Sequence, residues 1–179
     1  KHIYIRLQTN PSDPFGIYYQ ASIDRVYERD KASKTSFLKL LEMTKDQPLW
    51  QVLLLGNLGN LSYLEQNFIS AQEYYNQAKS LCIKHTFTSY LADIYYGQGI
   101  LFEWLHDVKK AEEQYKRNLE IDQSLEKKYA VISVYQSLGK LFCDAREFQK
   151  AKDPLSSALD LAIELDDKPT IASCQISFN

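Results

Sequence analysis

Three of the six glycines in this chain recur at a constant interval, and three alanines recur at the same interval, each twelve positions after its glycine. The glycines are Gly59, Gly99 and Gly139, and the alanines are Ala71, Ala111 and Ala151. Both series, called the glycine ladder and the alanine ladder below, repeat every 40 residues. Two ladders with one period indicate an internal repeat. A repeat constrains the fold strongly, because each unit must bury its apolar face against its neighbours.

The apolar residues of each unit are spaced as in helices. In the first unit the large side chains are Leu58, Phe68, Tyr75 and Leu81, and residues of similar kind take most of these places in the later units. Steps of three and four positions are typical of one face of a helix. The spacing therefore predicts that each unit forms two helices joined by a short turn. The expected ends of the first helices are Leu64, Trp104 and Asp144, and the expected starts of the second helices are Phe68, Val108 and Phe148.

Prolines mark two of the expected helix starts. Pro48 and Pro169 lie where first helices should open, and proline suits the first turn because its missing N–H needs no partner there. Pro154 lies about six residues into an expected second helix, where it removes the bond to the carbonyl of Lys150. We therefore expect this helix to bend or to start late.

The repeat pattern divides the chain into three parts. Residues 48–168 are expected to form three 40-residue repeats, over about 48–87, 88–127 and 128–168. Residues 1–47 lack the Leu-Gly pair and are expected to form a degenerate helical pair or a cap, with helices over 15–28 and 31–44. Residues 169–179 are expected to begin the first helix of a further, truncated repeat. The first eight residues, KHIYIRLQ, suggest the tail of an upstream helix, so we expect the sequence to be a fragment of a longer protein.

The recurring glycines require a compensating gain in packing. A glycine inside a helix costs about 1 kcal/mol relative to alanine. Close approach of the two helices of a pair would supply that gain. We therefore expect Gly59 to face Ala71 and Ala78 at a tight crossing.

The combined pattern resembles the tetratricopeptide repeat, whose signature is a large residue, Leu-Gly, an aromatic, a small residue, a second aromatic and a second small residue. The residues that carry the resemblance are Leu55, Leu58, Gly59, Phe68, Ala71, Tyr75 and Ala78, then Tyr95, Gly99, Phe102, Ala111 and Tyr115, then Tyr135, Leu138, Gly139, Phe142, Phe148, Ala151 and Ala158. The chain departs from the signature at Ser62, Gln98 and Asn118.

The common form of this repeat has about 34 residues, and the longer unit here is similar to repeats of kinesin light chains, cell-polarity adaptors, bacterial regulators and peptide-pheromone receptors. The resemblance implies an all-α fold, a right-handed superhelical solenoid of antiparallel helix pairs. First helices would line a concave groove and second helices would form the outer wall.

The resemblance also implies where a ligand would bind, on the first-helix face opposite the glycines. Transferred to this chain, the candidate positions are Gly56, Asn57, Asn60, Tyr63 and Leu64, then Tyr96, Gly97, Ile100, Glu103 and Trp104, then Gln136, Ser137, Lys140, Cys143 and Asp144. Asn57 and Asn60 could pair with a peptide backbone, and Tyr63, Tyr96 and Trp104 could offer flat apolar contacts. Packing within the core is an equally good role for Tyr96 or Trp104 alone. Lys140 is the one cation in these sets, which disfavours a clamp for a terminal carboxylate.

Other functional classes find no support in the sequence. The net charge of −2, without a basic block, disfavours direct nucleic-acid binding. Cys82, Cys143 and Cys174 have no metal-ligand or disulfide spacing, so we expect no metal, no cofactor and a reducing, cytoplasmic location. No apolar run is long enough to insert into a membrane. No catalytic motif is present, and we expect a protein that is not an enzyme.

Three functions fit these expectations. The first is a protein-interaction scaffold that binds a peptide segment or partner protein in its groove. The second is the ligand- or peptide-sensing segment of a larger bacterial signalling or transcription regulator, with the groove filled by a peptide or by another domain of the same chain. The third is a spacer or homo-oligomer that stacks through its terminal helices.

Overall fold

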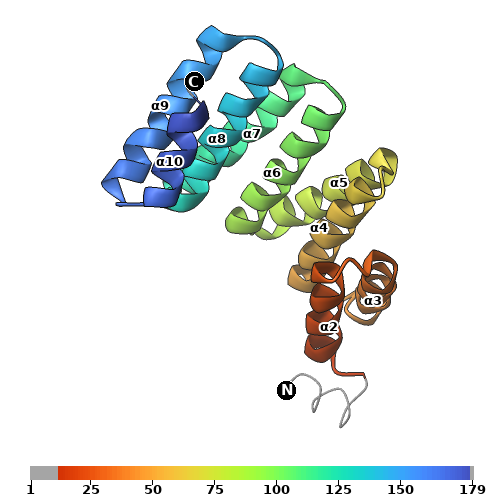
Figure 1. Ribbon diagram of the computed structural model, residues 1–179. Helices are drawn as coiled ribbons and strands as arrows, with labels where there is room; N and C mark the ends of the chain where they lie inside the picture. Colours follow the sequence, from red (N-terminus) through yellow and green to blue (C-terminus); the bar gives the residue numbers. More distant parts are fainter. Residues whose placement is uncertain (1–11, 178–179) are drawn as a thin grey trace. The chain divides into compact units, whose positions relative to one another are not determined.

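The computed structural model describes residues 12–177, and in this part of the chain the regular secondary structure is helical throughout (Figure 1). The helices are α2 (Pro14–Val26), α3 (Asp30–Met43), α4 (Pro48–Leu64), α5 (Phe68–His85), α6 (Thr88–Trp104), α7 (Val108–Ser124), α8 (Lys128–Asp144), α9 (Phe148–Glu164) and α10 (Lys168–Ser177). The all-α prediction is confirmed. The expectation about KHIYIRLQ lies outside the described residues.

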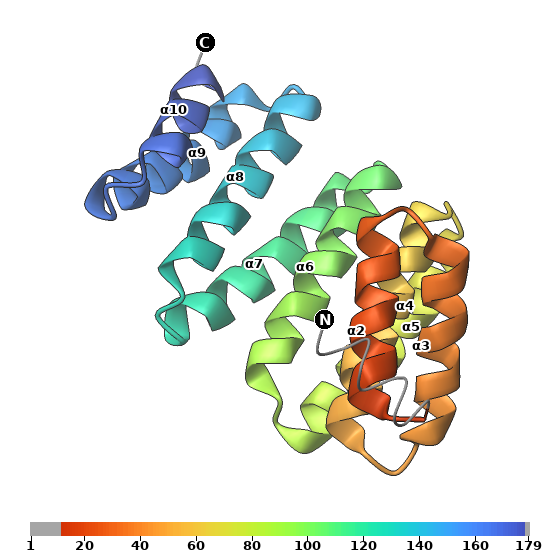
Figure 2. The ribbon, with the colours of Figure 1, turned by 60° about the horizontal axis from the view of Figure 1, so that its bottom comes forward.

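The described chain forms two compact units, and the boundary between them along the sequence lies between Phe87 and Thr88. The N-terminal unit consists of the hairpins α2–α3 and α4–α5, with α3 packed against α4 (Figure 2). The C-terminal unit consists of the hairpins α6–α7 and α8–α9 and of α10, with α7 packed on α8 and α9 on α10. The helices α2, α4, α6, α8 and α10 are called first helices below, and the others second helices.

The helix boundaries follow the predictions closely. The helices α4, α6 and α8 end at the expected residues, and α5, α7 and α9 begin at the expected ones. Pro48 opens α4 and Pro169 is the second residue of α10. In the N-terminal pair, the predicted ranges 15–28 and 31–44 agree with α2 and α3 to within two positions at each end.

Of the two expectations for α9, a bend or a late start, the late start is wrong. This helix begins at Phe148 and contains Pro154, which is buried. Proline lacks the N–H that would donate to the carbonyl of Lys150. The burial of the ring against neighbouring residues compensates for that missing bond, so the helix continues through the proline.

The backbone repeats with half of the period seen in the sequence. The helices α4 to α10 begin at equally spaced positions, namely Pro48, Phe68, Thr88, Val108, Lys128, Phe148 and Lys168. Every turn between the described helices, except the one between α3 and α4, contains one residue with a positive φ that is not glycine. These residues are Glu28, Gln66, Thr86, His106, Glu126, Arg146 and Asp166. In the turn after α4, the N–H of Gln66 donates to Tyr63 and that of Asn67 donates to Ser62, which closes the helix end by the usual left-handed motif.

Arg146 offers a direct test of this turn geometry. Its φ is 59°, in the left-handed region that glycine occupies without strain. We expect Arg146→Gly to stabilise the C-terminal unit by about 0.5–1 kcal/mol. The neighbouring Ala145 has φ −78°, so Ala145→Gly should destabilise the unit instead. Urea denaturation of both variants measures the difference, and equal effects at the two positions would contradict the assigned turn.

The glycines make room for a large side chain of the second helix, which corrects the expected contact with alanines. A Cβ placed on Gly59 would lie 2.6 Å from Cε1 of Tyr75, and one placed on Gly99 would lie 2.5 Å from Cε1 of Tyr115. At Gly139 the neighbour is Leu155, whose Cδ2 would lie 2.5 Å away. The nearest atoms thus belong to the residue four positions after the alanine. The alanines of the ladder are buried nearby in the same hairpins.

The N-terminal pair packs like the later pairs although its sequence pattern differs. Four of its residues are fully buried, and each lies 38 positions before a signature residue of the α4–α5 hairpin. These residues are Ala21, Ser33, Phe37 and Leu40, which correspond to Gly59, Ala71, Tyr75 and Ala78. The shorter interval arises because α3 has 14 residues and α5 has 18, whereas the turn after α3 is longer than the turn after α5. This correspondence favours a degenerate repeat over a cap.

Asn118, one of the departures from the signature, belongs to a buried polar cluster. Its Nδ2 donates to the carbonyl of Ala92 at 3.1 Å and to Oδ2 of Asp122 at 2.9 Å. The Nζ of Lys127 lies 3.3 Å from Oδ1 of Asp122 and donates to Oγ of Ser89 at 2.7 Å. The cluster thus joins α6, α7 and the residue that precedes α8. The corresponding residues of the other repeats are apolar, namely Ala78, Cys82, Ala158 and Ala162.

Candidate functional site

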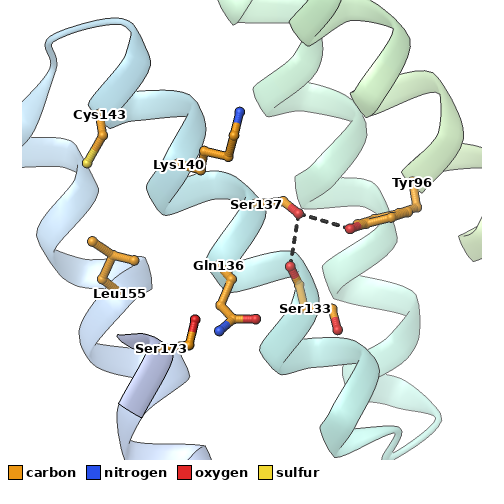
Figure 3. Close-up of a pocket in the computed structure, with 8 residues that line it drawn as sticks. All are labelled: Tyr96, Ser133, Gln136, Ser137, Lys140, Cys143, Leu155 and Ser173. Atoms are coloured by element: carbon orange, nitrogen blue, oxygen red, sulfur yellow. Dashed lines mark hydrogen bonds between the residues drawn. The ribbon is translucent and has the colours of Figure 1, made fainter. Parts of the chain in front are cut away.

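The first helices of the C-terminal unit line a cavity of about 520 Å³ (Figure 3). Five predicted groove residues are part of its wall: Tyr96 from α6, and Gln136, Ser137, Lys140 and Cys143 from α8. The remaining lining residues are Ser133, Leu155 and Ser173. The wall therefore comes mainly from α8, with one residue each from α6, α9 and α10. All of it except Leu155 belongs to first helices, which is the arrangement that the resemblance implied.

Hydrogen bonds fix the side chains of this cavity across neighbouring helices. The hydroxyl of Ser137 donates to the carbonyl of Ser133 at 3.0 Å, so the hydroxyl of Tyr96, 3.0 Å away, is the donor to Ser137. The Nε2 of Gln136 lies 3.6 Å from Sγ of Cys174 in α10. These contacts bridge α6, α8 and α10 and hold the cavity wall in one arrangement, which lowers the entropic cost of binding a ligand.

A second cavity, of about 600 Å³, lies at the C-terminal ends of α6 and α8. Four predicted positions line it: Glu103 and Trp104 from α6, and Lys140 and Asp144 from α8. The side chain of Trp104 is 57% exposed. The other lining residues are His106, Val108, Leu141 and Ala145. Lys140 lines both cavities, so the two lie next to each other along α8.

Lys140 is paired with two carboxylates. Its Nζ donates to Oδ2 of Asp144 at 2.8 Å and to Oε1 of Glu103. The bond to Asp144, and then the bond to Glu103, raise the pKa of Lys140 above the usual value for lysine. The lysine therefore keeps its charge, and the charged residues lining the second cavity have an excess of one negative charge. This pairing leaves Lys140 poorly suited to clamp a terminal carboxylate.

Gly59 and Gly99 leave room for Tyr75 and Tyr115, and each tyrosine hydroxyl donates to a predicted groove residue of the first helix. The hydroxyl of Tyr115 donates to Oε2 of Glu103 at 2.9 Å. In the N-terminal unit the hydroxyl of Tyr75 donates to Oδ1 of Asn60 at 2.7 Å. Burial raises the pKa of Tyr75, so this hydroxyl stays protonated and remains a donor. The packing residues of the repeat thus also orient groove side chains.

The candidates of the N-terminal unit are largely engaged within the chain. Asn57 donates to the carbonyl of Leu53 at 2.8 Å and accepts from Arg25 at 3.2 Å. Asn60 accepts from Tyr75, as described above. The ring of Tyr63 lies 6.5 Å from that of Phe68. Among these candidates Asn60 and Leu64 are exposed, and a ligand role for the set stays a prediction.

Ile100 is a candidate of the C-terminal unit that packs against the core. It is half-buried and packs with Tyr96 and Cys143 against the cluster around Tyr115. Packing accounts for its apolar side chain, and its role in binding stays a prediction.

The sequence-based set missed three residues of the first cavity: Ser133, Leu155 and Ser173. Ser133 lies one helical turn before Ser137, and Ser173 takes the place of Ser133 one repeat later, so extending the face by one turn would have found both. Leu155 takes the position of Tyr75 in the third repeat, which indicates packing rather than binding. It reaches the cavity because Gly139 has no side chain to cover it.

Metal clusters and membrane-spanning helices are both absent from the described residues. No group of three or more histidine, cysteine, aspartate or glutamate residues there could hold a metal ion. Within the same residues, no helix is both long and apolar enough to cross a membrane.

The fold and the groove define an all-α protein built from repeated antiparallel helical hairpins, with a cavity lined by the first helices. Residues 90–164, which run from α6 to α9, match the model of the tetratricopeptide repeat family. The tetratricopeptide repeats that the glycine and alanine ladders predicted are thus confirmed for residues 90–164. No curated protein matches the chain in sequence.

Solved structures of low sequence identity share the fold. A crystal structure of BtubC (BKLC) from P. vanneervenii is 18% identical, with a TM-score of 0.77 over 92% of this chain and 70% of that one. PilF of Pseudomonas aeruginosa is 16% identical, with a TM-score of 0.68 over 97% and 78%. A crystal structure of MamA is 18% identical, with a TM-score of 0.67 over 92% and 87%. At these identities the likeness concerns the fold.

Proposed function

We propose that the C-terminal unit binds a peptide segment of a partner protein in the groove formed by its two adjoining cavities, without catalysis. Tetratricopeptide repeats are typical scaffolds for protein–protein interaction. The observation that carries the proposal is the cavity lined by α6, α8 and α10, whose polar side chains are already held by hydrogen bonds between helices.

The composition of the groove suits a peptide. Tyr96, Gln136 and Ser137 offer hydroxyl and amide groups that can exchange hydrogen bonds with a peptide backbone. Leu155 supplies an apolar floor, and the indole of Trp104 supplies an exposed flat surface. A few placed polar groups beside apolar and aromatic surface are common in sites that recognise short segments.

A bulky substitution in the groove tests this proposal. Ser133 is exposed, lines the first cavity, and bonds within its own helix to the carbonyl of Tyr129. Ser133→Arg should therefore fill the groove without disturbing the core. It should lower the affinity for a groove-bound peptide more than tenfold, because lost complementarity at the centre of an interface costs about 2 kcal/mol.

The matched control is Asp153→Arg, an exposed position on the second helix α9. This variant should bind the peptide like the unchanged protein. Isothermal titration calorimetry measures both affinities, and circular dichroism verifies that the helical content persists. Equal affinity of the unchanged protein and Ser133→Arg would overturn the proposal.

A further inference from the structure

From the second cavity we infer that the groove recognises a basic side chain, arginine or lysine, of the bound peptide, held between the indole of Trp104 and the carboxylate of Asp144. This inference rests on the proposed function and specifies the chemistry of the partner. Its basis is that one cavity of about 600 Å³ is lined by both an exposed indole and more carboxylates than cations.

The indole supplies the first half of the recognition. Trp104 is the last residue of α6 and is 57% exposed, although a tryptophan side chain gains stability from burial. An exposed tryptophan at the wall of a cavity is a common anchor of protein interfaces. A cation over an indole face gains about 0.5–2 kcal/mol, and the guanidinium of arginine stacks on such a face especially well.

The carboxylates supply the second half. Glu103, Lys140 and Asp144 are the residues of this cavity wall that carry a full charge at neutral pH, two negative and one positive. Glu103 accepts from both Tyr115 and Lys140, so its two oxygens are engaged. Asp144 accepts from Lys140 through Oδ2, and its side chain is 61% exposed. An arriving cation therefore finds its best partner in Asp144.

Lys140 would compete with the cation of the peptide. Its Nζ occupies the space between the two carboxylates, and its side chain is 64% exposed, so it can move aside. Removing this internal cation should strengthen the binding of a basic peptide. Removing Asp144 or Trp104 should weaken the binding of that peptide. A general loss of structure would weaken binding in all three variants, so tighter binding without Lys140 distinguishes a specific cation site.

Phage display tests the inference. A library of random peptides is used, because it does not require an identified partner. The full chain is immobilised, and enriched peptides are synthesised for calorimetry at two salt concentrations. We expect enriched peptides to share an arginine or lysine next to an apolar residue. Their affinity should fall as salt rises, because exposed charges are screened.

Four variants then locate the basic side chain. For an enriched peptide, Trp104→Ala should weaken binding about tenfold and Asp144→Asn about threefold. Lys140→Met should tighten it about threefold. The control Asp153→Asn, which removes an exposed carboxylate of α9, should leave the affinity unchanged.

The remaining outcomes separate the two claims. Enriched peptides that lack a basic residue but lose binding in Ser133→Arg would overturn the inference and leave the proposed function standing. Enriched basic peptides that bind Asp144→Asn and Trp104→Ala like the unchanged protein would also overturn it. If no peptide is enriched, or if Ser133→Arg binds every enriched peptide unchanged, the proposed function falls as well.

Discussion

Replacing Lys127 by methionine is expected to destabilise the C-terminal unit by about 2–4 kcal/mol. The side chain of Asp122 is 4% exposed, and Lys127 is its cationic partner. Removing one member of a buried pair leaves an uncompensated charge, which costs about 3–5 kcal/mol. The destabilisation expected for Lys127→Met is smaller than this, because the lysine is 34% exposed and water can partly replace it.

The other repeats provide the control for this prediction. They place Ala78 and Cys82, or Ala158 and Ala162, where the second repeat has Asn118 and Asp122. The variant that combines Lys127→Met with Asn118→Ala and Asp122→Ala contains no buried charge at this place. We expect it to be more stable than Lys127→Met alone, since a buried polar cluster can be replaced as a whole at little cost.

The two tryptophans allow this stability to be measured in one unit at a time. Trp50 lies in the N-terminal unit and Trp104 in the C-terminal unit. In a Trp50→Phe background, urea denaturation followed by tryptophan fluorescence therefore reports on the C-terminal unit. If Lys127→Met unfolds at the same urea concentration as its parent, the polar cluster does not stabilise this unit.

Gly99→Leu is the second substitution with a large expected effect, a destabilisation of about 3 kcal/mol. Even a single Cβ at this position would lie 2.5 Å from the ring of Tyr115, which is fully buried and has no free space to move into. The gain in helix propensity over glycine is about 1 kcal/mol and cannot offset such a clash.

A double-mutant cycle identifies the ring as the cause. In a Tyr115→Ala background the space left by the ring can accept the leucine, so Gly99→Leu should cost much less there than in the unchanged protein. Gly139→Ala serves as a milder comparison, because its neighbour is the flexible side chain of Leu155. Thermal unfolding measures all of these variants. Equal costs of Gly99→Leu in both backgrounds would show that the glycine does not face Tyr115.

The sequence predicted the helices because its strongest signals, the glycine and alanine ladders, lie in helix interiors. It did not predict the shorter period of the backbone, since the turns use residues such as Arg146 and His106 at positive φ, where glycine is the usual signal. The predicted partner of each glycine was also wrong. Residue spacing places Tyr75 and Ala71 on one face of a helix but does not show which of them meets Gly59.

The candidate site, like the fold, could be predicted only in part from the sequence. The resemblance to tetratricopeptide repeats implied that Tyr96, Gln136 and Trp104 lie on the open face of the first helices, and the structure places each in a cavity wall. Periodicity could not show that Asn57 and Asn60 have partners within the chain, because those partners, Arg25 and Tyr75, come from other helices. The pairing of Lys140 with Glu103, which is distant in the sequence, likewise depends on how α6 and α8 pack.

Site-specific photo-crosslinking tests the central claim most directly. A photoreactive amino acid at Ser133 reports contacts in the groove, and one at Asp153 reports contacts of the outer helix α9. Both proteins would be irradiated with a peptide enriched by the phage selection, and the adducts mapped by mass spectrometry. We expect adducts from position 133 and none from position 153. Adducts from position 153 without any from position 133 would contradict a peptide-binding groove on the first helices.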